Sequence, residues 1–565
     1  MEAHQKYSTS YLYSIAFLFL AAMHYYQVDG GGIGLSLSYN STTWIAVSLI
    51  IAVGCWKSAV SGVIRWSKID LALLLVFIVL LIPLSWSASP WRESTYDRYL
   101  GIAAFLLVVF VHRQFALTES QKQIFWAIIA GAALIQGVIG VIQFIIPEYF
   151  HFVKSGRPVG TLLQANVYAS FLATGLAVSF YQIFAVNLSQ RFKTLHYAVV
   201  FVCVLVEYLV RSRTGMLGSA FVILFMFFLY RTQVKKIRGL TLLMLAAVAT
   251  AMAIAVIPQL LSPNDAASYK RENISSAGAR AIIYPLSLDI IKEAPLMGHG
   301  LGKFSTVYMD KQLTFFAENP SLIKYSIWLN HPHNELLLWG IEAGLFIVLL
   351  LIVFVVWLSW QIWRKGSLPN KSAWICLLPI ALHTQTELPF YTSAPHLILC
   401  ALLLAESLPG KIYAVKNSLD FLTKCLAALL VLLTNAFMIS NLNTTALLVR
   451  YNEDKNPADL EAVINPMGQQ HILLVRRVEL LMQTATPEAF DLVESIAKSQ
   501  LTLNPSDVMY FFLYKAQSRN GKQREAIITK ARGQQLFPNS ILFKSANPFK
   551  PNAVPKTIPK PNVRP

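Results

Sequence analysis

Long apolar stretches separated by short polar segments fill the chain up to about residue 440. About thirteen of these stretches have the roughly 17–25 residues needed to cross a bilayer core of about 30 Å. They centre near residues 20, 51, 78, 107, 135, 176, 204, 222, 249, 347, 380, 402 and 430. The pattern predicts an all-α fold, a polytopic membrane helix bundle of about 13 spans.

Two features of this pattern need a separate interpretation. The first apolar run, from Tyr11, is followed by further spans and by no small-residue cleavage pattern, so we interpret it as a span and not as a signal peptide. The runs near residues 204 and 222 are separated only by Arg211–Ser212–Arg213. So short a link predicts a tight hairpin or a broken helix.

The Lys and Arg residues concentrate in alternate loops, for example around Arg65, Arg113 and Arg238. Because cytoplasmic loops of membrane proteins carry the excess of positive charge, these loops are expected inside. This topology puts the N-terminus inside and the C-terminus outside. It also puts a large loop, 258–334, and the tail from residue 441 on the outer side.

The tail has a higher charge density, and its apolar residues recur at helical spacing. Leu503–Asn504–Pro505 and Leu536–Phe537–Pro538 are similar signals, each predicted to close a helix pair. Their spacing is close to the tetratricopeptide period of about 34 residues. We therefore predict a transmembrane domain over 1–440, a helical repeat-like domain over 441–546 and a disordered Pro/Lys-rich end over 547–565.

Composition supports the membrane assignment and removes other classes. Hydrophobic residues make up 55% of the chain and charged residues only 13%, too apolar a balance for a soluble protein. The net charge of +18 is scattered through loops, without the basic stripe and interleaved aromatics of a nucleic-acid binder. All five cysteines fall in apolar runs, which fits core packing and neither a disulfide frame nor a metal site.

Two histidines, His331 and His333, stand where a polar loop enters the apolar run from Leu336. A zinc site is one interpretation, with further ligands from His299, Glu335 or His383. A second is an interfacial histidine satisfied by the backbone. The third is a general base, since the pKa of imidazole lies near neutrality and a neighbouring Asn334 or Glu335 would fix its tautomer.

Polar residues in two other segments could bind an anionic or sugar substrate. Arg213, between the two closely linked spans, and Arg280, in the large loop, are both expected on the outer side. Guanidinium groups match phosphate oxygens bidentately, although an arginine at a membrane boundary can also simply reach for water. Gln164 and Asn166 open a span from the outer side and could hydrogen-bond sugar or cap the helix.

Glycines near the histidines have a structural interpretation. Gly340 and Gly344, four residues apart, would lie on one helix face and allow close approach of a second helix. The glycine-rich segment 295–304 does not follow a strand in a βαβ unit, so we exclude a nucleotide-binding loop and predict a tight turn.

The order of these motifs resembles the O-antigen ligase and polymerase superfamily, and more closely its PglL-type protein O-oligosaccharyltransferases. The resemblance rests on His333–Asn334 followed after nine residues by Gly344, on Ser212–Arg213–Thr214–Gly215, on 160–169 and on 298–302. It covers roughly residues 10 to 540. One departure is Ile347, where the signature prefers Gly, Thr or Tyr.

The resemblance implies a metal-independent glycosyltransferase of the bacterial inner membrane, without cofactor, whose active site faces the periplasm. It would transfer an oligosaccharide from undecaprenyl diphosphate to a Ser or Thr hydroxyl of an acceptor protein such as a type IV pilin. His333 would be the catalytic base. The residues predicted to bind substrate are Arg213, Arg280, Gln164, Asn166, His331 and Asn334.

Four other functions remain open at this point. An O-antigen ligase would use lipid A core as acceptor, and an O-antigen polymerase would use another lipid-linked glycan. A transporter or flippase would instead place polar residues at mid-span, in broken helices and inverted repeats. The polar residues here gather at the predicted outer boundary, and the helical tail offers a docking surface for a protein acceptor, which favours the first interpretation. A scaffold that only binds pili would not need the arginines.

Overall fold

The computed structural model describes residues 2–28, 32–150, 156–261 and 275–544. They are helical almost throughout, with one small sheet, so the predicted all-α membrane bundle is confirmed. The chain divides into two compact units. The first comprises Met1–Ile274, Ala294–Gly302 and Pro332–Leu473, and the second comprises Ser275–Glu293, Lys303–His331 and Leu474–Pro565.

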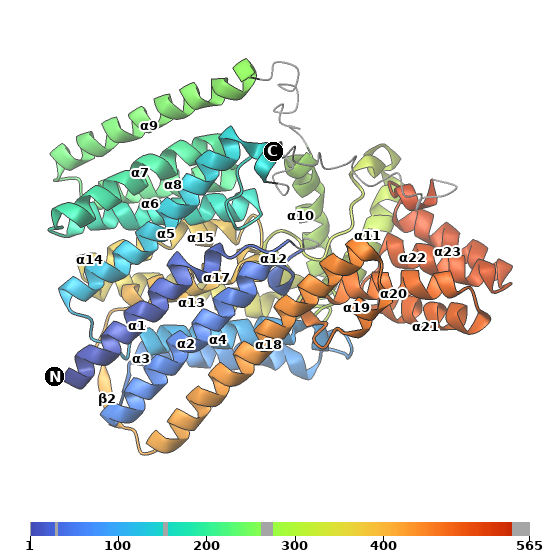
Figure 1. The fold of residues 1–565 in the computed structure, drawn as a ribbon, viewed down its shortest axis with the longest axis horizontal. Helices are drawn as coiled ribbons and strands as arrows, with labels where there is room; N and C mark the ends of the chain where they lie inside the picture. Colours follow the sequence, from blue (N-terminus) through green and yellow to red (C-terminus); the bar gives the residue numbers. More distant parts are fainter. Residues whose placement is uncertain (1, 29–31, 151–155, 262–274, 545–565) are drawn as a thin grey trace, which may run out of the picture. The chain divides into compact units, whose positions relative to one another are not determined.

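The first unit contains the apolar helices (Figure 1). Its long N-terminal helices are α1 (Glu2–Leu20), α2 (Ser38–Ser61), α3 (Lys68–Leu81), α4 (Tyr96–His112), α5 (Glu119–Ile145), α6 (Ala165–Ala185), α7 (Gln190–Val210), α8 (Arg213–Leu229) and α9 (Val234–Leu261). Its later helices are α12 (Glu335–Ala343), α13 (Leu345–Lys365), α14 (Leu368–Ile375), α15 (Leu378–His383), α16 (Pro389–Thr392), α17 (Ala394–Ser407), α18 (Asp420–Asp454) and α19 (Pro457–Glu461).

Nine helices of the described residues are long and apolar enough to cross a membrane, namely α2 to α7, α9, α13 and α18, with α3 and α4 each extended by a 3-10 turn. The apolar helices α8 and α17 are shorter. Two of the predicted spans are not single long apolar helices in the structure. The first, α1, begins with polar residues and is not among the nine, and the one near residue 380 is split.

The split near residue 380 follows from proline chemistry. α14 ends at Ile375 and α15 starts at Leu378, with Pro379 in its first turn. Proline has no N–H for a helical hydrogen bond, so it is accommodated best in the first turn of a helix. The second short helix ends at His383, and a polar loop follows it instead of a continued span.

The centre of the first unit is α6. It is buried along its whole length, whereas only 17% of the apolar window of α9, α13 or α18 is buried. α5, α7, α8 and α15 pack around it, and α2 and α18 lie side by side elsewhere in the bundle (Figure 1). A helix that is buried on every side needs small residues, and α6 supplies Ala169, Ala173, Gly175 and Ala177.

The link between α7 and α8 is a tight hairpin, one of the two predicted forms, because the Ser219 hydroxyl of α8 donates to Glu207 Oε1 of α7 at 2.7 Å. Arg211 takes a left-handed conformation, with φ of 54°, and ends α7. Ser212 then caps α8, and its hydroxyl accepts from the Gly215 N–H at 3.2 Å. Gly215 packs so tightly on α6 that a Cβ there would stand 2.5 Å from the Cβ of Ala169.

A two-stranded antiparallel sheet was not predicted. β1 (Val63–Trp66) pairs with β2 (Tyr413–Lys416), with Val63 opposite Lys416. The strands belong to the α2–α3 and α17–α18 loops, which the charge pattern had assigned to one side of the membrane. The pairing places both loops at the same end of the bundle.

The apolar run from Leu336 is two helices and not one. Gly344, with φ of 86°, separates α12 from α13, so the prediction that Gly340 and Gly344 pair on one helix face is wrong. A Cβ at Gly344 would stand 2.1 Å from the carbonyl oxygen of Leu296. Gly344 is therefore required because the 294–302 segment, and not a second helix, packs closely against it.

The second unit joins part of the large loop to the tail. It holds α10 (Ser275–Glu293), α11 (Phe304–Glu318), most of α20 (Gln470–Thr484), α21 (Pro487–Leu503), α22 (Asp507–Arg519) and α23 (Gln523–Leu536). α21 ends at Leu503 and α23 at Leu536, where the two proline signals predicted helix ends. Met309 of α11 packs against Leu536 and Phe537, which ties the loop to the tail.

This division differs from the boundaries expected from sequence in two places. Residues 303–331 group with the tail and not with 1–440, because their apolar side chains pack on α23. α18 continues without a break to Asp454, beyond the expected boundary at 440, because no proline or glycine interrupts it. The segment 547–565, predicted to be disordered, lies outside the described residues.

Candidate active site

His333 is held at the start of α12 in an unusual backbone conformation. Its φ is 56°, a region that non-glycine residues seldom adopt and that costs about 1–3 kcal/mol. Asn334 follows as the N-cap, and its side-chain oxygen accepts from the Leu337 N–H at 3.0 Å. The local sequence thus fixes the imidazole beside a helix N-terminus.

A carboxylate completes a pair with this imidazole. His333 Nδ1 lies 2.7 Å from Glu387 Oε2, and the two side chains are 26% and 13% exposed. A carboxylate on Nδ1 favours the tautomer whose basic nitrogen is Nε2, and it stabilises the imidazolium that forms when Nε2 takes a proton. The pair has the chemistry of a general base that solvent or substrate can reach.

Glu387 belongs to a polar loop, Thr384–Glu387, that also contacts the elements around His333. The Glu335 N–H donates to the Thr384 carbonyl at 2.9 Å, and the Asn334 amide donates to the Gln385 carbonyl at 3.1 Å. Asn334 therefore caps α12 and anchors this loop, a structural role in addition to the substrate binding predicted for it.

The same loop reaches the segment that carries Arg213. Thr386 and Thr214 share a hydrogen bond at 3.0 Å between their hydroxyls. Arg213, the first residue of α8, is exposed, and Glu387 follows Thr386 directly. The Thr214–Thr386 and His333–Glu387 hydrogen bonds therefore link the N-terminus of α8 to the start of α12 through this loop. Arg213 and His333 both belong to the first unit.

Gln164 and Asn166 lie beside α8 at the start of α6. The Ser212 hydroxyl donates to Asn166 Oδ1 at 2.8 Å, so Asn166 ties α6 to the N-cap of α8. Gln164 takes the N-cap position of α6 without capping it through its side chain. Its buried Oε1 has no hydrogen-bond partner among the described residues.

The other two predicted substrate-binding residues belong to the second unit. Arg280 lies half-buried on α10, and His331 is the final residue of the 303–331 segment. The structure brings Asn166, Arg213, His333 and Asn334 together within the first unit; the proposed roles of Arg280 and His331 remain predictions.

A metal ion beside His333 would need more protein ligands than the first unit supplies there. His333 and Glu387 offer two ligand atoms, while a catalytic zinc site generally uses three protein ligands. His331, the other histidine of this stretch, belongs to the second unit. His383, one of the candidate ligands, is buried, and its Nδ1 lies 2.8 Å from the Ser170 hydroxyl.

The glycine-rich segment 295–304 contacts α12 at its C-terminal end. The His299 and Gly300 N–H groups donate to the Ile341 and Glu342 carbonyls at 2.8 and 3.0 Å. Gly298, with φ of 66°, would place a Cβ 2.6 Å from the Glu342 carbonyl carbon. The predicted tight turn is therefore hydrogen-bonded, backbone to backbone, to the C-terminal end of α12.

Two charged residues of this region were missed by the sequence reasoning. Glu387 stands as a lone carboxylate between the apolar runs near 380 and 402, a signal that is informative in membrane proteins. Arg98 opens the apolar run of α4 and forms a buried ion pair with Glu342 at 2.7 Å. Near them, burial raises the pKa of the Glu335 carboxyl, against the lowering effect of the Arg98 guanidinium.

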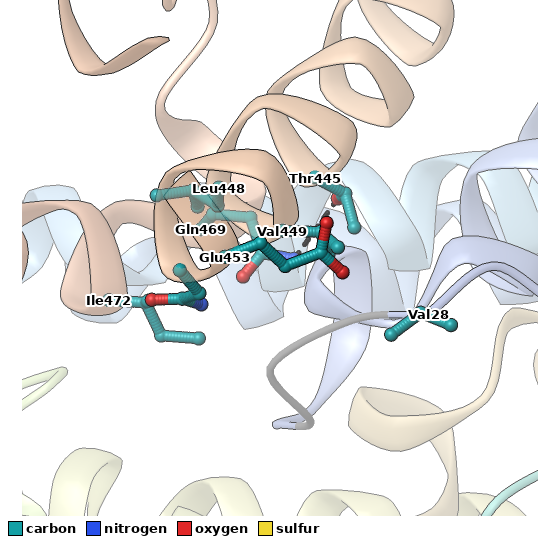
Figure 2. Close-up of a pocket in the computed structure, with 8 residues that line it drawn as sticks. Val28, Thr445, Leu448, Val449, Glu453, Gln469 and Ile472 are labelled. Carbon is teal, nitrogen blue, oxygen red and sulfur yellow. Dashed lines mark hydrogen bonds between the residues drawn. The ribbon is translucent and has the colours of Figure 1, made fainter. Parts of the chain in front are cut away.

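A surface cavity of about 230 Å³ lies elsewhere in the first unit (Figure 2). Leu448, Val449 and Glu453 of α18 form one side of it, and Gln469 and Ile472 contribute to the rest. Its lining includes none of the residues described above, so the chemistry of the His333 region does not involve this cavity.

Comparison with known proteins gives two family matches. Residues 196–353 match the family described as O-antigen ligase, and residues 372–547 match the virulence factor membrane-bound polymerase, C-terminal family. An uncharacterized protein of Haemophilus influenzae is 23% identical over 338 residues, which cover 58% of this chain and 80% of that protein.

The two matches together cover Arg213, His333, Glu387 and the helical tail. They identify a multi-pass membrane protein of the glycan-transferring kind. Together they match the O-antigen ligase and polymerase superfamily, as the order of the motifs indicated.

Proposed function

We propose that the protein is a protein O-oligosaccharyltransferase of the bacterial inner membrane, with its active site facing the periplasm. It transfers an oligosaccharide en bloc from undecaprenyl diphosphate to a Ser or Thr hydroxyl of an acceptor protein, with a type IV pilin as the expected acceptor. The observation that carries the proposal is the 2.7 Å pair of His333 and Glu387 at the start of α12.

In the proposed reaction, His333 Nε2 takes the proton of the acceptor hydroxyl as its oxygen attacks the anomeric carbon. A neutral hydroxyl is a poor nucleophile, so a positioned base lowers the barrier. The new glycosidic bond forms with inversion while the bond from the anomeric carbon to the diphosphate oxygen breaks. Glu387 stabilises the imidazolium throughout this step.

The leaving lipid diphosphate takes the electron pair of the broken bond and gains negative charge. Arg213 would bind it, a role supported by its exposure at the α8 N-terminus and by the hydrogen bond of the neighbouring Thr214 to Thr386. The N-terminal N–H groups of α8 add a favourable dipole for an anion. Arg280 would supply a second guanidinium, and Gln164 would donate or accept hydrogen bonds to the glycan.

The test is reconstitution of the purified protein in liposomes with an undecaprenyl-diphosphate-linked oligosaccharide and a purified pilin. Intact mass of the pilin should increase by one whole glycan, and peptide mapping should place it on a Ser or Thr. An unchanged pilin mass, with transfer only to lipid A core, would replace the proposal by its alternative.

That alternative is an O-antigen ligase, which the family match over residues 196–353 favours by its description. The same base and arginines would serve, because donor and leaving group are shared. Only the acceptor differs, and the same assay with lipid A core in place of pilin distinguishes the two.

A further inference from the structure

A buried guanidinium lies behind the candidate base. Arg98 of α4 is 2.7 Å from Glu342 Oε2 of α12, and the two side chains are only 9% and 3% exposed. Burying an ion pair has a large desolvation penalty, which close geometry and further contacts must offset. The other contacts of Arg98 therefore indicate which elements the ion pair connects.

Two aromatic rings flank the guanidinium. It lies 5.2 Å from the centre of the Trp339 ring and 5.5 Å from that of Tyr391, distances suited to cation–π attraction. Both rings also donate to Glu335 Oε1, the Trp339 indole at 3.0 Å and the Tyr391 hydroxyl at 3.3 Å. Arg98 thus joins α4, α12 and α16 in one buried cluster.

The cluster adjoins both members of the catalytic pair. α12 begins at Glu335, two residues after His333, and α16 begins at Pro389, two residues after Glu387. The geometry points to Arg98 as a positioning residue that fixes the spacing of His333 and Glu387 without touching substrate. This inference rests on the proposed function.

The same helix provides a matched control. Arg113, at the other end of α4, pairs with Asp70 at 3.1 Å, and these side chains are 8% and 10% exposed. Arg113 also contacts Ser67 and the Leu408 carbonyl, which flank neither His333 nor Glu387. The fifteen-residue separation corresponds to about 22 Å along the helix.

The experiment compares Arg98→Met with Arg113→Met in the liposome assay. Arg98→Met should lower kcat by about 10- to 100-fold, the loss expected from a misplacement of about 1 Å. KM for the lipid-linked glycan should stay within about twofold, because Arg98 does not contact it. Arg113→Met should keep kcat per folded molecule. Equal kcat losses in both variants, or a normal kcat in Arg98→Met, would overturn the inference.

A double-mutant cycle separates positioning from general damage. If Arg98 acts through the pair, Arg98→Met should add less than about threefold to the loss already caused by Glu387→Gln. Fully multiplicative losses would refute the assignment. Arg98→Lys keeps the charge but loses the planar stacking, so it should recover kcat only in part.

Folding is controlled by removing both charges. Arg98→Met with Glu342→Leu leaves no unpaired buried charge, so the double variant should fold if Arg98→Met alone does not. Recovered folding with a reduced kcat supports positioning, and full recovery of kcat overturns it. Wild-type protein and His333→Ala run in parallel, since an inactive wild type would count against the proposed function and not against Arg98.

Discussion

Two histidine–glutamate pairs in the first unit have the same distance but different surroundings. His333 and Glu387 are 2.7 Å apart, and so are His112 and Glu406. His112 ends α4, and its other nitrogen lies 2.7 Å from the Tyr11 hydroxyl. Its side chain is 5% exposed, against 26% for His333.

The difference shows what makes such a pair suited to catalysis. Tyr11 and Glu406 occupy both ring nitrogens of His112, so its imidazole holds three helices together and has no capacity to take a substrate proton. His333 binds its carboxylate through Nδ1, is more exposed than His112, and is held at a loop–helix junction with a left-handed backbone. Solvent access and the position at a loop–helix junction, not the pair itself, distinguish the candidate base.

The largest effect is expected from replacing the two histidines. His333→Ala should lower kcat by about 10⁴-fold, the upper range for a general base, with the protein still folded in the membrane. His112→Ala should keep kcat per folded molecule but lose stability by about 2 kcal/mol or more, because Tyr11 and Glu406 would be left unpaired. Glycan transfer and detergent-phase melting measure the two quantities. Normal transfer by His333→Ala would end the base assignment.

Replacing the two carboxylates sharpens the comparison. Glu387→Gln should lower kcat by about 10²–10³-fold, because the amide no longer stabilises the imidazolium. Glu406→Gln should leave kcat unchanged and lower the melting temperature. Steady-state transfer rates at saturating donor measure this, and an equal loss of kcat in both variants would show that the pairs do not differ in kind.

Arg213 extends the test from the base to the leaving group. Arg213→Ala should lower kcat/KM for the lipid-linked donor by about 10²-fold, since a charge is lost where negative charge develops. Arg213→Lys should recover part of this. A donor titration measures the effect, and unchanged donor kinetics in Arg213→Ala would remove it from the site.

Metal removal is the smallest expected effect. Treatment with a chelator should leave transfer unchanged, because His333 and Glu387 act as base and partner and not as ligands. A transfer rate that falls on chelation and returns with zinc would instead make the two residues ligands and would favour the zinc interpretation of His331 and His333.

Local signals predicted much of the fold. The apolar runs predicted the membrane helices, and the 33-residue separation of Pro505 and Pro538 matched the observed ends of α21 and α23. Such signals are carried within a few turns of helix, by periodicity and capping. The region near residue 380 failed because one proline splits an otherwise adequate apolar run.

The sequence by itself determined that this is a membrane helix bundle with an imidazole at a loop–helix boundary and a helical tail. Only the tertiary structure decided which groups meet there. Glu387 is 54 residues from His333 in the chain, and Arg98 is 244 residues from Glu342. No local pattern encodes such pairs, because the packing of whole helices brings them together. Once the charges are buried, removing either partner leaves the other unpaired at a large cost in free energy.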